Sequence, residues 1–268
     1  MTASVEEDEE QQNLHQLMRE LAPVPGWVDR IGNGTLSASA GSPMAGDDRR
    51  SAPFHVSHSV AASLGVAVDH AHCLLRSIEG CTECSPHQVT LLMNSYYSLL
   101  RAAMENAARV VWMLAPDKRP ERVLRRLRLQ AGNVIMSDEL CEVGGFPPKK
   151  PKAERLQRIK DIAGQAGVSP TEAIKPAGNK QIIRAAGQHI AGDANHAEVL
   201  WRACSAASHG DIWAALSLHE RRITSENGDV FTAYASASTR VLTTFVVETM
   251  AVIRTAVLLS DVRNQPPY

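Results

Sequence analysis

Apolar residues recur every three or four positions through two long stretches of this chain. In the first stretch, from His55 to Ile78, they are Val60, Leu64, Ala67, Ala71, Leu74 and Ile78. In the second, from His87 to Leu114, they include Leu91, Tyr96, Leu99, Leu100, Ala103, Ala107, Val110 and Leu114. This spacing matches the 3.6-residue turn of an α-helix and gives each stretch one apolar face. Because the joining segment is short, we expect two antiparallel helices packed as a hairpin.

The remaining sequence also favours helices. Apolar residues make up 44% of the chain but aromatic residues only 4%, and alanine, leucine and valine supply most of the apolar content. Further helices are predicted over residues 5–21, 119–134, 153–166, 178–187, 194–208 and 230–260. The turn at residues 226–229 could instead join two strands. We therefore predict an all-α fold, a four-helix up-down bundle core with a helical insertion.

Composition divides the chain into segments. Residues 1–54 should form an N-terminal helix and a flexible loop, because residues 32–53 are rich in glycine, serine, alanine, aspartate and proline. Residues 55–268 should form the helical bundle domain. Within it, residues 117–192 are interrupted by proline and glycine, so we expect an inserted helical elaboration there.

Charge and hydropathy indicate a cytoplasmic protein with no membrane partner. The net charge is −1, and the first residues have neither the basic nor the apolar part of a secretory signal. The longest apolar run, residues 241–259, contains Glu248 and Arg254, as a core helix would rather than a membrane span. The five cysteines should then be free thiols.

Arg202 and His209 are the strongest candidates for chemistry. They lie seven residues apart on a predicted helix, so both project from one face, with Ser205 between them. A permanent cation beside a titratable imidazole can bind a phosphodiester and transfer a proton. The alternative is structural: Arg202 pairs with Glu198 and His209 caps the helix end before Gly210.

Arg101 and Glu105 form a second polar pair, four residues apart in an otherwise apolar helix. Either they extend the Arg202–His209 site, with Glu105 orienting a cation, or they form an internal ion pair. Glu248 and Arg254 are similar charged residues within the last helix, so several of these side chains could form one network.

An arginine followed within a few residues by a histidine, late in a helix of a four-helix bundle, resembles the HEPN superfamily. The segment WRACSAASHG around Arg202 and His209, with the upstream Arg101-x3-Glu105 pair, is similar to HEPN-like bacterial helical proteins. The resemblance covers residues 55–115 and 194–260. Ala203 follows Arg202, whereas active members usually carry a polar residue there.

The resemblance implies a metal-independent endoribonuclease of a toxin–antitoxin or phage-defence system, with no cofactor. Arg202 would stabilise charge on the cleaved phosphate, His209 would transfer or position a proton, and Arg101 and Glu105 would support them. RNA, a second copy of the chain in a homodimer, and a cognate antitoxin are the partners implied.

A basic segment, residues 118–128, carries six basic residues and one acid. Helical spacing places Arg122, Arg125 and Arg126 near one face, which could bind RNA phosphates. The alternative is a solvated face or a cover for acidic patches elsewhere in the protein. Few aromatic residues lie among these cations, which argues against a stacking platform for single strands.

A weaker candidate is a metal site made by Cys81, Cys84 and His87, near His70, His72 and Cys73. A closed zinc site needs four ligands, and the chain offers only one Cys-x2-Cys pair, so free thiols are the alternative. No glycine-rich phosphate loop, GxSxG or HExxH motif is present. A non-catalytic helical interaction protein, or a bundle that binds a small molecule or metal, therefore remains the alternative function.

Overall fold

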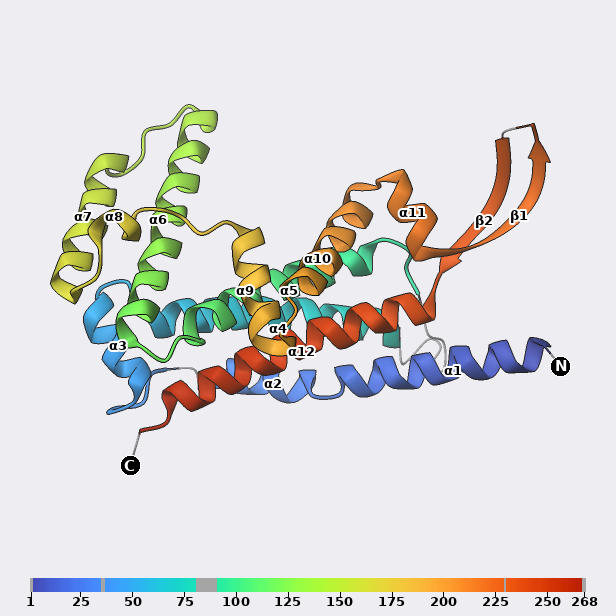
Figure 1. Cartoon of the computed structure of the whole chain (residues 1–268), viewed down its shortest axis with the longest axis horizontal. Coiled ribbons are helices and arrows are strands. Elements are labelled where there is room, and N and C mark those ends of the chain that lie inside the picture. The colour runs from blue at the N-terminus through green and yellow to red at the C-terminus, as the bar shows by residue number, and fades with distance from the viewer. Residues whose placement is uncertain (1, 35–36, 81–90, 229, 267–268) are drawn as a thin grey trace.

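The computed structural model describes residues 2–34, 37–80, 91–228 and 230–266, which are mostly helical with one two-stranded hairpin (Figure 1). The first helices are α1 (Thr2–Leu21), α2 (Val24–Gly32), α3 (Pro43–Ser51), α4 (Val56–Glu79), α5 (Ser95–Leu114) and α6 (Arg119–Gly144). They are followed by α7 (Lys152–Ala166), α8 (Pro170–Ala173), α9 (Asn179–Ala191), α10 (Ala194–His209) and α11 (Ile212–Leu218). Strands β1 (His219–Asn227) and β2 (Val230–Ala237) then lead into α12 (Thr239–Asn264).

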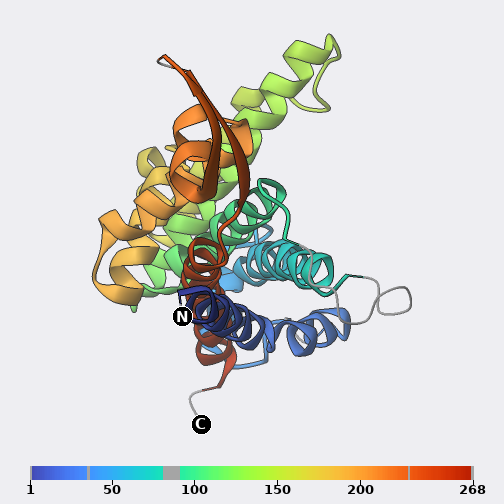
Figure 2. The same ribbon diagram turned by 90° about the vertical axis from the view of Figure 1, so that its right-hand side faces the viewer.

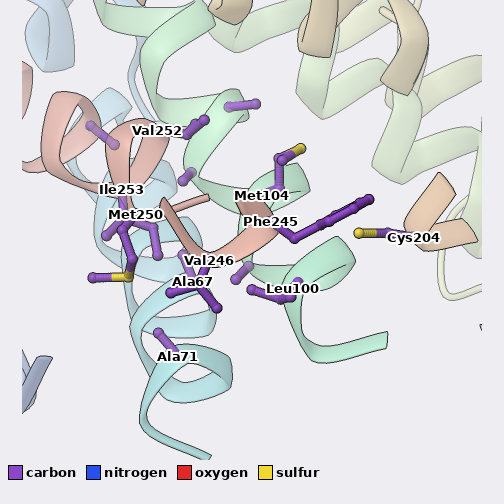
Figure 3. Packing of buried hydrophobic residues seen from close by; sticks show 14 of the residues in the cluster. Ala67, Ala71, Leu100, Met104, Cys204, Phe245, Val246, Met250, Val252 and Ile253 are labelled. Atoms are coloured by element: carbon purple, nitrogen blue, oxygen red, sulfur yellow. The ribbon is translucent and has the colours of Figure 1, made fainter. Parts of the chain in front are cut away.

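Helix α5 lies at the centre of the main core. It packs against α4 and α12 and, on another side, against α9 and α10, while α1 runs along α12. Leu100 and Met104 of α5 meet Phe245 and Val246 of α12 in this core (Figure 3). These side chains are the periodic apolar residues of the sequence, and their burial is the main contribution that holds the helices together.

Helices α6, α7 and α8 have a small core of their own. Val123, Leu127 and Ala131 of α6 pack with Ile159 of α7 and Ala173 of α8, separately from the main cluster. Helix α9, by contrast, packs against α10 and α5. The segment predicted as one insertion, residues 117–192, therefore divides between two cores.

The N-terminal segment is more ordered than predicted. The flexible loop expected over residues 32–53 is wrong for residues 43–51, which form α3 with Ser42 as its N-cap and Pro43 in its first turn. Leu17 and Leu21 of α1 and Met44 of α3 are buried in the main core. The composition suggested a loop because α3 is short and its buried residues are mostly polar.

The last long helix was predicted to begin at Val230, which is wrong. Residues 230–237 form β2, paired antiparallel with β1, and α12 begins only at Thr239 behind the N-cap Ser238. Valine, phenylalanine, threonine and tyrosine in this segment favour a strand. The hairpin projects away from the helices (Figure 1 and Figure 2).

Two further findings concern helix ends and length. Helix α5 begins at Ser95 rather than at His87, and Cys81, Cys84 and His87 lie outside the described residues.

In the described part of the chain, α12 is long and apolar enough to cross a membrane by length and composition. Its buried face packs against α5 and α1.

Candidate functional site

Helix α10 carries the Arg202–His209 pair on its outer face. Asp193 caps its first turn by accepting bonds from the backbone N–H groups of Asn195 and His196. The helix ends where Gly210 takes a left-handed conformation, with φ of 74°, which glycine adopts without steric cost. Ala203, Cys204, Ala206 and Ala207 face the core. This leaves Arg202 and His209 exposed, with Ser205 half-buried between them.

The structure brings His209 next to Arg101 of α5. Nη1 of Arg101 lies 3.4 Å from Nε2 of His209. Because a guanidinium only donates, this contact requires the His209 tautomer whose Nε2 lone pair is free. On its other side, Nε of Arg101 donates to Oε1 of Glu105 at 3.1 Å. His209 therefore joins the Arg101–Glu105 pair in one polar cluster between α5 and α10.

Trp201 is a member of this cluster that the sequence did not reveal. Its indole N–H donates to Oε1 of Glu105 at 2.7 Å, so one carboxylate oxygen accepts from both Trp201 and Arg101. The guanidinium of Arg202 lies over the Trp201 ring, 6.0 Å from its centroid. Trp201 thus connects Arg202 to the α5 residues, which no spacing rule within one helix could predict.

A second contact joins the ends of these helices. Oγ of Ser98, one turn before Arg101, donates to Oγ of Ser208 at 3.0 Å. The Ser208 hydroxyl in turn donates to the carbonyl of Cys204 at 2.7 Å. These bonds fix the register of α10 against α5 beside His209.

Arg202 itself belongs to an ion-pair cluster on the α9 side of α10. Its Nε lies 2.8 Å from Oε1 of Glu198, as the structural alternative expected. Glu198 also pairs with Arg184 at 2.6 Å and with Lys180 at 3.4 Å. The hydrogen bond from Arg184, and after it the one from Arg202, are the largest causes that lower the pKa of Glu198 to about 2. With three basic neighbours and one carboxylate, this cluster carries a local excess of positive charge.

The low pKa of Glu198 makes a prediction about acid stability. Because the pKa of this carboxylate is lower in the folded state than its ordinary value of 4.5, the ionised carboxylate stabilises the folded protein fully at pH values above 4.5. That contribution is lost as the pH falls from 4.5 toward 2. The Glu198→Gln variant should therefore be less stable than wild type at pH 6, and the difference should shrink between pH 4.5 and 2. Urea unfolding of both proteins at several pH values measures it. A difference that stayed constant with pH would contradict the linkage.

The basic surface predicted on α6 is wrong for two of its three arginines. Arg122 is 2% exposed and forms a two-bond ion pair with the buried Asp47 of α3, at 2.6 and 2.9 Å. Arg126 is 8% exposed and donates to the carbonyl of His55 at 3.0 Å. Burial lowers its pKa to about 10. Arg125 is half-buried, donates to the carbonyl of Trp112 and pairs with Glu121.

The reason for this misreading is that helical spacing shows which residues share a face but not what covers that face. Here α3 and the segment that precedes α4 cover it, and the arginines satisfy carboxylate and carbonyl groups there.

The network expected from the last helix is also dispersed. Glu248 faces His196 of α10 at 3.3 Å, and Arg254 pairs with Glu20 of α1 at 2.6 Å. Among the described residues, the ion pairs of Glu248 and Arg254 therefore lie apart from the Arg101–His209 cluster. Cys204 reaches into the core from α10 (Figure 3), and burial raises its pKa to about 12, which makes it a poor nucleophile.

A metal centre finds no support in the described ranges, which contain no group of three histidine, cysteine, aspartate or glutamate side chains able to hold an ion. The candidate ligands Cys81, Cys84 and His87 are outside those ranges. Of their predicted neighbours, His70 contacts the carbonyl of Val66 at 2.8 Å and Cys73 is exposed.

Comparison with protein-family models, curated proteins and solved structures gives no match to this chain. The arguments for its function therefore rest on the geometry of α5 and α10.

Proposed function

We propose that this chain is a HEPN-like, metal-independent endoribonuclease, in which α4, α5, α10 and α12 correspond to the four-helix up-down bundle of that superfamily. One observation carries the proposal: Arg101 approaches His209 across the α5–α10 contact, at 3.4 Å, while Glu105 holds the same guanidinium from behind. A cation held beside an exposed imidazole can catalyse phosphodiester cleavage, because the imidazole can transfer a proton while the cation stabilises charge on the phosphate.

The roles follow from the contacts. A phosphate that binds the guanidinium of Arg101 lies within reach of Nε2 of His209. His209 would take the proton of the RNA 2′-hydroxyl, whose oxygen attacks the adjacent phosphorus, or return a proton to the departing 5′-oxygen. Arg101 would stabilise the negative charge that develops on the phosphate.

Arg202 becomes a second, outer cation rather than the main phosphate ligand. Its Nε is held by Glu198, but its side chain is 57% exposed, so the remaining guanidinium nitrogens can reach a phosphate of the same strand. Glu105 and Trp201 would be positioning residues. Glu105 accepts hydrogen bonds from Arg101 and Trp201, and the Trp201 ring lies beneath the guanidinium of Arg202. Ser205 would lie along the substrate between Arg202 and His209.

The substrate and partners are part of this proposal. The proposed substrate is RNA, since DNA lacks the 2′-hydroxyl that attacks the phosphorus in this mechanism. A homodimer would supply two α10 helices to one cleft, and a cognate antitoxin would cover that face in the cytoplasm.

RNA cleavage in the presence of a chelator tests the proposal. We expect His209→Ala and Arg101→Ala to lower the cleavage rate by about 100-fold or more, the usual contribution of a positioned acid or base. The products should carry a 2′,3′-cyclic phosphate and a 5′-hydroxyl. An RNA with a single 2′-deoxy nucleotide at the cleaved position should resist.

Two neighbouring residues offer matched controls. His196 is an exposed histidine of the same helix and contacts Glu248 instead. Arg109 lies two turns after Arg101 on α5, where it contacts Asn106 and Asn179. His196→Ala and Arg109→Ala should cleave within a few-fold of wild type. Equal rates for all four variants, or no cleavage by wild type, would end the nuclease proposal.

A non-catalytic interaction protein is the second candidate. It is favoured by the full ion pairing of Glu198 with Arg202, Arg184 and Lys180, which a purely structural cluster would also show. Under this reading Arg202→Ala destabilises the fold and His209→Ala has no effect on RNA.

A further inference from the structure

Three cations meet at one carboxylate on the surface formed by α9 and α10. Lys180 and Arg184 lie one turn apart on α9, and Arg202 lies one turn after Glu198 on α10. We call Lys180, Arg184 and Arg202 the α9–α10 cationic cluster, and all three pair with Glu198. Even with Asp193 counted, which caps the start of α10, the cations here outnumber the carboxylates. This surface therefore attracts anions.

The three cations remain available to a ligand. The side chains of Lys180, Arg184 and Arg202 are 60%, 39% and 57% exposed, whereas that of Glu198 is 11% exposed. Each cation has more N–H donors than its bond to Glu198 uses, because an ammonium has three and a guanidinium five. Within the described ranges, Asn195 is the one other side chain that accepts a hydrogen bond from the cluster, from Arg184 at 2.7 Å. Glu198 thus holds the cations from beneath and leaves donors for an anion outside.

The cluster has a fixed position relative to the candidate site, because α10 carries residues of both. Eleven positions separate Glu198, near the start of the helix, from His209 at its end. At about 1.5 Å per residue, this separation is about 16 Å along the helix. A nucleic-acid strand advances by about 3.4 Å per stacked nucleotide and further when it is extended, so about three to five nucleotides bridge the distance.

Side-chain contacts also make the cluster continuous with the site. The guanidinium of Arg202 lies over the ring of Trp201, and Trp201 shares the carboxylate of Glu105 with Arg101. A strand that leaves Arg101 along α10 therefore meets Arg202 first and the α9 residues after it.

We propose that the α9–α10 cationic cluster binds the phosphate backbone of RNA about three to five nucleotides from the phosphate that is held at Arg101 and His209. Arg202 contacts the strand nearer to the cleaved bond, and Lys180 and Arg184 contact phosphates farther along it. The inference rests on the proposed function, because that function makes RNA the substrate of the neighbouring site. It adds α9 as the element that holds the strand away from the reacting atoms.

A binding assay with a non-cleavable RNA tests the inference. The probe is a fluorescein-labelled twelve-nucleotide RNA in which fluorine replaces every 2′-hydroxyl, so that it has no attacking group, and fluorescence anisotropy measures its Kd. Lys180→Gln/Arg184→Gln removes two cations of the cluster. Lys150→Gln/Arg76→Gln is the matched control, because Lys150 and Arg76 are exposed and each pairs with one glutamate. Lys180→Arg/Arg184→Lys keeps both charges, and circular dichroism checks the folding of each variant.

We expect Lys180→Gln/Arg184→Gln to raise the Kd for this RNA at least about tenfold, because contacts to phosphates supply much of the affinity. The slope of log Kd against log salt concentration should fall by about 1.4, since each lost contact to a single strand removes about 0.7. The control and the charge-preserving variant should bind within about threefold of wild type. In cleavage assays, Lys180→Gln/Arg184→Gln should raise KM more than it lowers kcat.

Four results would overturn the inference. They are a wild type that does not bind the RNA, an unchanged Kd in Lys180→Gln/Arg184→Gln, an equal loss in the control or the charge-preserving variant, and binding of a twelve-residue polyglutamate as tight as that of RNA. The last result would assign the surface to an acidic protein instead.

The assay also separates this inference from the nuclease proposal. A wild type that binds the probe through Lys180 and Arg184 but cleaves no RNA would contradict the proposed function alone. Cleavage that depends on His209, with RNA binding that does not depend on Lys180 and Arg184, would contradict this inference alone.

Discussion

Replacing Asp47 with alanine is expected to destabilise the protein by about 3–5 kcal/mol, the usual cost of removing one partner of a buried ion pair. Asp47 is fully buried and accepts two bonds from Arg122, and Arg119 pairs with the same carboxylate at 3.1 Å. Without it, the buried Arg122 guanidinium keeps only the carbonyls of Pro116 and Asp117 as partners. Urea denaturation measures the loss.

Two controls separate burial from simple loss of charge. Asp261→Ala removes the ion pair with Arg30, whose side chains are about one-third exposed, and should cost about 1 kcal/mol or less. The double variant Asp47→Leu/Arg122→Met should be more stable than Asp47→Ala, because it leaves no unpaired buried charge. A double variant as unstable as the single one would show that the cost lies in packing instead.

Gly187→Ala should destabilise the protein by about 1–3 kcal/mol, the range found for overpacking a close contact. A Cβ atom at this position of α9 would lie 2.5 Å from Cβ of Ala197 and 2.8 Å from the carbonyl oxygen of Asp193. Since the second atom is backbone, α9 and α10 would have to move apart. Thermal and urea unfolding report the change.

Gly164→Ala is the matched control on α7. This helical glycine has no atom within 4 Å of its hypothetical Cβ, so alanine should raise stability by up to about 1 kcal/mol through better helix propensity. Opposite signs for the two glycines are the expected result. A neutral Gly187→Ala would mean that α9 and α10 separate at little cost.

Several features of the fold follow directly from the sequence. The apolar periodicity of α4 and α5 predicts their buried faces, and Gly210 marks the end of α10. These features depend on neighbours three or four residues apart, which the helix itself brings together. The hairpin was only an alternative reading, because VFTAYAS is compatible with both a strand and the start of an apolar helix.

The candidate site shows the limit of that local reasoning. Spacing correctly placed Arg202 and His209 on one face and paired Arg101 with Glu105. It could not show that Arg101 approaches His209, or that Trp201 shares Glu105, because these contacts join residues about 100 positions apart. Likewise, the arginines of α6 have the same sequence pattern whether they face water or, as here, the carboxylate of Asp47.

The sequence by itself determined the long helices with a regular apolar face, such as α4 and α5, since these depend on local periodicity. It did not determine the short polar helix α3 or the strand β2, whose conformations depend on their surroundings. Only the tertiary structure decided which polar groups meet. The position of α10 against α5 places His209 beside Arg101, and the position of α3 against α6 buries Arg122. A charged side chain takes its role from the partner and the burial that packing gives it, and neither is encoded in spacing along one helix.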